Sequence, residues 1–185
     1  MGKIYESLNP ELQEWLGQQK VFFVATAPLE TDGHVNCSPK GGDSFRVVSE
    51  HEVAYIDLTG SGIETAAHVQ ENGRIVIMFC AFSGPPKIVR LHGTGKVIYP
   101  GDPQFAELKG RFPDHPGTRA IILVTLTRIS DSCGWAVPRL DFVAHRDGLD
   151  KWTEKQGSEE LRTYRSTTNR NSVDNIPGYV EKPQA

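Results

Sequence analysis

Two side chains that could bind an anion lie two residues apart, near the end of a predicted strand. Ser38 carries a hydroxyl group and Lys40 an ammonium group, with Pro39 between them. Residues i and i+2 of a strand face the same side of a sheet, so both groups could point at one ligand unless Pro39 bends the strand. The alternative interpretation is a hairpin with a surface lysine, and the residue types alone leave both open.

A second segment, residues 57–65, places hydroxyls and glycines directly before a predicted helix. The N-terminus of a helix has free N–H groups and a partial positive charge, which suit a phosphate. The segment lacks the third glycine of the dinucleotide fingerprint, and the chain has no GxxxxGK[ST] pattern. The alternative is an ordinary helix that is capped by Thr59 or Ser61, with Glu64 in its first turn.

Two further residues are candidates for ligand contacts. Lys87 begins a long predicted strand and could reach a phosphate, although lysines on sheet faces are usually solvated. Trp135 follows a glycine in an irregular segment and could stack on a flat cofactor, although a tryptophan there more often packs. The sequence places no histidine beside Cys133, and it shows no CxxC, HxxxH or HxH spacing, so neither a cysteine nucleophile nor a metal site is predicted.

The elements that must position these residues are mainly strands. Seven apolar and β-branched segments bounded by turn residues predict about six strands, joined mainly by hairpins. The segments lie within residues 21–27, 34–38, 45–48, 52–58, 74–82, 87–99 and 119–129. Helices are predicted over residues 10–17, 63–72, 102–112, 148–157 and 158–169. Because the helices do not alternate with the strands, the pattern favours a mainly β fold, a small antiparallel barrel with peripheral helices.

Length and composition limit the architecture and the partners. The 185 residues suit one domain over residues 1–170, followed by a polar stretch, 171–185, that predicts a flexible tail. A net charge of −3 argues against nucleic-acid binding through bulk positive charge. No apolar run approaches the ~20 residues that a membrane span needs, and no signal-peptide core is visible, so a cytoplasmic protein is expected.

Taken in order, these segments resemble the pyridoxamine 5′-phosphate oxidase-like family of FMN-binding split β-barrels, and its uncharacterised bacterial branch most closely. The similarity spans residues 21–129. It is carried by the runs 21–27, 36–41, 55–65, 72–74 and 90–93, and residues 133–138 are similar to the C-terminal motif of that branch.

The resemblance implies a six-stranded antiparallel split β-barrel that forms a homodimer, with FMN at the subunit interface and a small-molecule substrate or electron donor. Position by position, Ser38 and Lys40 match the strand beside the flavin, and Thr59 matches a hydroxyl residue after the next strand. Ser61, Gly62 and Thr65 match the phosphate-side loop and helix start. Lys87 matches a basic position at the start of the long strand, and Trp135 an aromatic near the partner subunit's flavin.

Two departures bear on the substrate. Glu64 and Thr65 stand where the true oxidases have an Arg-Lys pair, and their C-terminal Arg-x-His is not visible. Pyridoxamine is therefore not predicted as the substrate. The resemblance favours a flavin-dependent oxidoreductase in which no side chain stands out as an acid or base. The alternatives are a relative that binds a deazaflavin or haem, and a flavin-binding stress or sensor protein without turnover.

Overall fold

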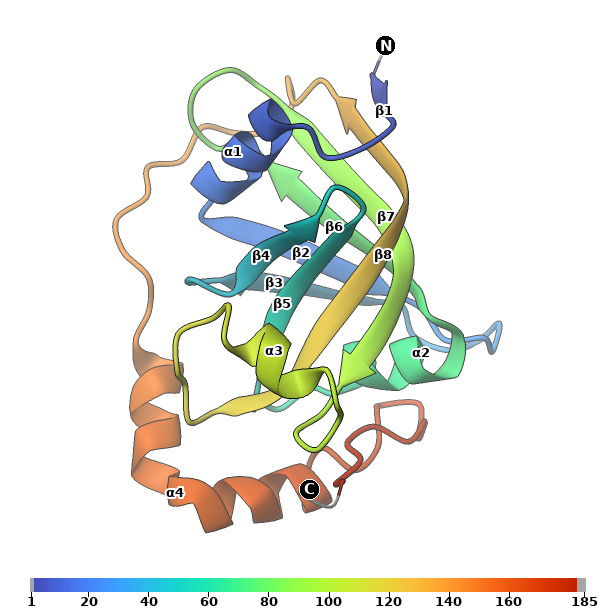
Figure 1. The fold of residues 1–185 in the computed structure, drawn as a ribbon, viewed down its shortest axis with the longest axis vertical. Helices are drawn as coiled ribbons and strands as arrows, with labels where there is room; N and C mark the ends of the chain where they lie inside the picture. The colour runs from blue at the N-terminus through green and yellow to red at the C-terminus, as the bar shows by residue number, and fades with distance from the viewer. Residues whose placement is uncertain (1, 183–185) are drawn as a thin grey trace.

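The computed structural model describes residues 2–182, in which one curled antiparallel sheet is surrounded by four helices (Figure 1). The strands are β1 (Ile4–Tyr5), β2 (Val21–Thr26), β3 (Asn36–Gly41), β4 (Phe45–Ser49), β5 (Glu52–Leu58), β6 (Arg74–Cys80), β7 (Ile88–Ile98) and β8 (Thr118–Ser132). The helices are α1 (Pro10–Gln18), α2 (Glu64–Asn72), α3 (Phe105–Lys109) and α4 (Gly148–Thr167). The strand order is β3-β2-β6-β7-β8-β5-β4, and β1 pairs with β8 outside this path.

The sheet curls until residues near its two ends meet. Phe22 of β2 lies 5.4 Å, between ring centroids, from Phe45 of β4, and Phe79 of β6 lies 5.0 Å from Phe45. Since β2 and β4 stand near opposite ends of the strand order, these contacts close the interior around a shared aromatic core. The predicted mainly β barrel is confirmed, although the sheet has eight strands where about six were predicted. The two residues of β1 are too few to show an alternating pattern.

Gly93 lets the two longest strands approach each other where they bend. A Cβ atom at this position would lie 2.3 Å from the Thr125 carbonyl oxygen and 2.7 Å from Val124 Cγ1. The pairing of β7 with β8 shifts register between His92 and Gly93. The glycine therefore marks a bulge in the strand.

The helices largely follow the sequence signals. At the start of α1, Asn9 accepts a hydrogen bond from the Leu12 N–H at 2.9 Å, and Pro10 occupies the first turn. The two helices predicted over 148–157 and 158–169 form α4, which is kinked at Gly157, where φ is 78°. Helix α3 covers only five of the residues predicted over 102–112. None of the described helices is long and apolar enough to cross a membrane.

Residues 171–182, whose polar composition predicted a flexible tail, contact the body of the protein. The Gly178 carbonyl oxygen accepts hydrogen bonds from the Tyr99 hydroxyl at 3.0 Å and from Gln70 Nε2 at 2.7 Å. Tyr179 packs edge-on against Tyr99, and Lys182 forms an ion pair with Asp102. These contacts hold the segment beside α2 (Figure 1). Residues 183–185 of the predicted tail lie outside the described residues.

Candidate functional site

A cavity of about 390 Å³ lies between β3, β5 and the start of α2, and we call it the polar cavity after the charged and hydroxyl side chains in its wall. Its wall includes the cationic side chains of Lys40 and Arg119 and the hydroxyl residues Ser38 and Thr65. A larger outer cavity of about 830 Å³ begins at the same wall. The residues shared by the two cavities come mainly from β3 and β5 and include Pro39, Lys40, Gly41, Ile56 and Leu58. A ligand with a polar end and a flatter apolar body could extend from one cavity into the other.

The charges of the polar cavity form a connected ion-pair network. The guanidinium of Arg119 donates to Asp57 Oδ2 from Nε at 2.9 Å and from a terminal nitrogen at 2.7 Å. The Lys40 ammonium lies 3.4 Å from the other carboxylate oxygen. Burial would raise the pKa of Asp57, but the positive charges of Arg119 and Lys40 outweigh it and hold that pKa below its ordinary value. The network therefore carries two positive charges and one negative charge at neutral pH.

Asn36, on the same strand as Ser38, orients the two hydroxyls of the cavity. Its side-chain oxygen accepts a hydrogen bond from Ser38 at 2.9 Å, and its amide nitrogen donates to Thr65 Oγ1 at 3.0 Å. The same amide lies 3.2 Å from Thr26 Oγ1, which in turn shares a 3.0 Å hydrogen bond with His68 Nδ1. This connected set of bonds ties β2, β3 and α2 together behind the cavity.

The loop before α2, residues 59–63, presents its backbone to the cavity. Gly60 and Gly62 line the wall, and Ser61 is exposed beside them. Neither Thr59 nor Ser61 caps the helix, because Ile63 occupies the N-cap position and no side chain accepts a hydrogen bond there. The first N–H groups of α2 are therefore available to a ligand acceptor.

Thr59 was predicted to contact a ligand, but in this structure its hydroxyl bonds to other parts of the chain. Its buried hydroxyl donates to the Gly117 carbonyl oxygen at 2.9 Å and accepts from Arg165 Nε at 2.7 Å. Thr59 does not line the polar cavity. Thr59 holds in place the loop that lines the cavity, so it would affect ligand binding only indirectly.

Lys87 and Trp135 lie apart from the other predicted site residues. The Lys87 ammonium sits 5.0 Å above the ring centroid of Trp15 and lines a separate cavity of about 570 Å³. Trp135 is 84% exposed. Within one chain, the structure brings Ser38, Lys40, Gly62 and Thr65 together and leaves these two residues elsewhere.

The outer cavity is bounded on its far side by residues 140–150, which follow the last strand. His145 in this segment accepts a 3.3 Å hydrogen bond at Nδ1 from the Gly42 N–H. The ring of Phe142 lies 4.8 Å from the ring of His145. Aromatic side chains thus face the end of β3 across the cavity. The irregular sequence here gave no signal for this role.

Sequence reasoning also missed Arg119, Asp57 and Asn36. A signal did exist for Arg119 and Asp57, since each is a charged residue within an apolar strand. In the structure no more than 3% of either residue is exposed. Such residues are almost always paired.

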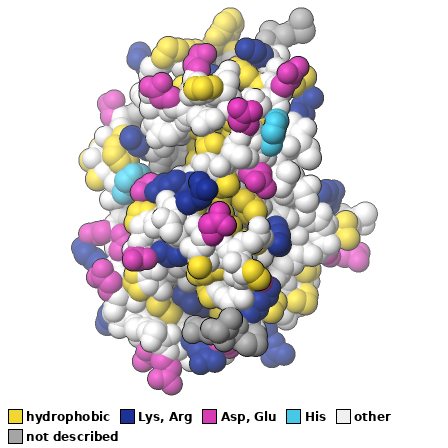
Figure 2. Space-filling view, viewed as in Figure 1, with side chains coloured by type: hydrophobic (Ala, Val, Ile, Leu, Met, Phe, Trp, Pro, Cys, Tyr) yellow, Lys and Arg dark blue, Asp and Glu magenta, His cyan; other side chains and the backbone are white. Residues whose placement is uncertain are grey.

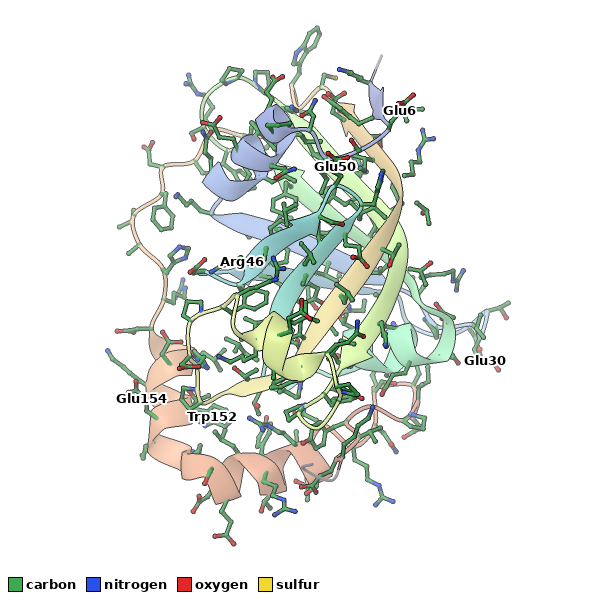
Figure 3. The ribbon with its side chains drawn as sticks, viewed as in Figure 1. Glu6, Glu30, Arg46, Glu50, Trp152 and Glu154 are labelled. Carbon is green, nitrogen blue, oxygen red and sulfur yellow. The ribbon has the colours of Figure 1, made fainter. Side chains whose placement is uncertain are left out.

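Elsewhere on the surface, charged side chains of both signs are interspersed on the face that Figure 2 shows. Arg46, labelled in Figure 3, illustrates this pattern, since it pairs with Asp43 and packs on Phe112.

Comparisons with known proteins bear on the family and on the fold. The model of the family described as pyridoxamine 5′-phosphate oxidase matches residues 8–133. The pyridoxamine 5′-phosphate oxidase family protein ustO of Aspergillus flavus is 40% identical over an alignment 191 residues long, which covers 94% of this chain and 76% of that protein. Because this relative is fungal, the similarity to a bacterial branch stays a prediction.

Two solved structures share the fold. HupZ of Group A Streptococcus superposes with a TM-score of 0.53 at 22% identity, covering 68% of this chain and 99% of that chain. A FAD-binding protein of Mesorhizobium loti superposes with a TM-score of 0.50 at 12% identity, covering 71% of this chain and 96% of that chain. At these identities the likeness concerns the fold alone.

Proposed function

The chain belongs to the pyridoxamine 5′-phosphate oxidase family, and from that premise we propose that it binds FMN in the polar cavity and the outer cavity beside it. The observation that carries the proposal is the grouping of Lys40 and Arg119 with the uncapped start of α2. A phosphate at this position would meet two cations, the hydroxyls of Ser38 and Thr65, and backbone N–H groups. The description of the Mesorhizobium loti protein as FAD-binding lends support, since it has the same fold.

The polar cavity is lined by two cations and two carboxylates, so a phosphate there would depend on the placement of the charges and not on a net positive charge. Asp57 offsets one of the two cations of the network, which leaves one net positive charge. Glu64 also lines the cavity in the first turn of α2 and would repel a phosphate. Arg119 thus supplies from β8 a cation that is missing at Glu64 and Thr65, where the true oxidases have an Arg-Lys pair.

The outer cavity suits the ring system and a small substrate. Its volume of about 830 Å³ lies within the range of roughly 300–1,000 Å³ that is usual for small-molecule sites. Bound flavin would supply hydride or electron transfer, while the chain binds and orients it. The backbone of β3 from Pro39 to Gly41 forms the inner wall, and residues within 140–150 line the opposite side. The substrate or electron donor in this proposal is a small molecule.

A homodimer is part of this proposal. Lys87 and Trp135 match family positions near a flavin but lie outside the polar cavity of their own chain, so a second copy would have to bring them there. Large apolar side chains also remain exposed between residues 135 and 149, and Trp135 and Val143 are 84% and 93% exposed. Multi-angle light scattering at micromolar concentration tests this, and a monomer that binds FMN tightly would contradict it.

The absorbance spectrum of the purified protein tests the cofactor, before and after FMN is added and dialysed away. Retained flavin peaks are expected, and reoxidation after bleaching by NAD(P)H would favour an oxidoreductase. Retained flavin without turnover would favour the stress or sensor alternative. A protein that retains no flavin would refute the FMN proposal and favour the deazaflavin or haem alternative.

A further inference from the structure

The last part of the chain, after the kink of α4, reaches the loop that begins α2. The family model ends at residue 133, so these residues lie beyond the segment that it matches. Figure 1 shows the second half of α4 and the C-terminal turn passing below the barrel, next to α2. Contacts from this part reach Thr59, Gly60 and Ile63, which together span the loop.

Asn169 makes the central contact. Its side chain is fully buried, with 0% exposure. Its amide nitrogen donates to the Gly60 carbonyl oxygen at 2.8 Å, and its amide oxygen accepts from Arg119 at 2.8 Å. The same guanidinium nitrogen of Arg119 donates to the Gly62 carbonyl oxygen at 3.0 Å. One asparagine thus holds both the loop backbone and the buried cation of the polar cavity.

Two neighbours of Asn169 fix the rest of the loop. Arg165 donates from Nε to the Thr59 hydroxyl at 2.7 Å. Gly178 packs so closely on Ile63, the N-cap residue of α2, that a Cβ atom there would lie 2.6 Å from Ile63 Cγ1. The loop is therefore held at its first, second and last residues. The residues that hold it come more than 100 positions later in the chain than the residues they contact.

We infer that Asn169 and Arg165 are positioning residues that set the loop 59–63 and Arg119 for the phosphate end of the ligand. This inference rests on the FMN site proposed above. Neither residue lines the polar cavity, so neither would touch the ligand. Asn169 would act through the carbonyl of Gly60 and, by way of Arg119, through that of Gly62, whereas Arg165 would act through the Thr59 hydroxyl. These contacts orient the peptide groups of the loop and so decide where its N–H groups point.

Comparing FMN with riboflavin separates positioning from general stabilisation, because riboflavin lacks the phosphate. We expect Asn169→Ala to raise the Kd for FMN about tenfold, the factor that corresponds to one lost hydrogen bond, and to leave the Kd for riboflavin unchanged. Titrations that follow flavin fluorescence well below the unfolding temperature measure both constants. Ser166→Ala is the matched control, since Ser166 is exposed at the same helix end and bonds only to the Thr163 carbonyl oxygen.

A second variant keeps the test valid if Asn169→Ala does not fold. Arg165→Met retains an aliphatic side chain, removes the bond to Thr59, and should show the same selective loss of FMN affinity. An equal loss for FMN and riboflavin, or no loss for either, would overturn the inference. If the wild-type protein bound neither flavin, the proposed function itself would fall, which is a distinguishable result.

Discussion

Replacing Lys40 by methionine should weaken FMN binding while the protein stays folded. The change removes one of the two cations of the polar cavity and keeps most of the aliphatic stem. Asp57 would still accept two hydrogen bonds from Arg119, at 2.9 and 2.7 Å, so the buried carboxylate keeps its stronger partner. The ion pair between Lys40 and Asp57 is long, at 3.4 Å, and the lysine side chain is 26% exposed. Its loss should therefore lower the free energy of unfolding by no more than about 1 kcal/mol.

The loss of ligand affinity should be larger than the loss of stability. A hydrogen bond to a charged group contributes about 1.5–3 kcal/mol, which corresponds to a rise in Kd of roughly 10- to 150-fold. Fluorescence titration with FMN measures it, and thermal unfolding checks the fold. Lys155→Met is the control, because it removes the same charge from an exposed position on α4. Equal FMN affinity in the two variants would refute the assignment of Lys40 to the site.

Three further predictions concern other parts of the molecule. Glu64→Gln should tighten FMN binding severalfold, because it removes a negative charge from the cavity, and the same titrations should show an unchanged affinity for riboflavin. Since a negative charge stabilises the N-terminus of a helix, the change should also lower the stability of the protein by about 0.3–1 kcal/mol. Asp174 accepts a hydrogen bond from His34 and raises its pKa above 6.5, so the stability that this pair contributes is fully present below pH 6.5 and is lost as the pH rises through the raised pKa. Urea unfolding of wild type and His34→Gln across this range should converge at alkaline pH, and a constant difference would contradict the reasoning. Gly178→Ala should destabilise the protein by roughly 1–3 kcal/mol through the clash with Ile63, and an unchanged melting temperature would show that the C-terminal turn shifts freely.

The strands could be predicted because burial imposes a pattern on them. In β2, Phe22 and Val24 are buried and alternate with half-buried residues, which is the period of two that marks a strand. The start of α1 was equally visible, since the cap and the proline act locally. β1 could not be predicted from its own residues, because its two residues form a strand only through pairing with β8.

The site was predictable to the extent that it depends on neighbouring residues in the chain. Ser38 and Lys40 line one cavity because they share a face of β3, and Pro39 is tolerated there because β3 lies at the edge of the sheet. Arg119 reaches Asp57 across 62 positions, through the antiparallel register that pairs Asp57 with Ala120. A charged residue inside an apolar strand indicates that a partner exists, but only the register identifies it.

The C-terminal turn shows why composition was a poor guide to order. Its residues are polar, and a polar segment can bury little apolar area. For that reason its composition predicts a mobile segment. Several hydrogen bonds that hold this turn use its backbone atoms: the Gly178 carbonyl oxygen accepts from the Tyr99 hydroxyl and the Gln70 side-chain amide, and the Gly178 N–H donates to the Arg170 carbonyl oxygen. Because no side chain of the turn takes part in them, the composition of the turn does not reveal them. Asn169 and Arg165, which we infer to position the loop 59–63, also reach partners more than 100 positions earlier in the chain, Gly60 and Thr59, so this connection became visible only in three dimensions.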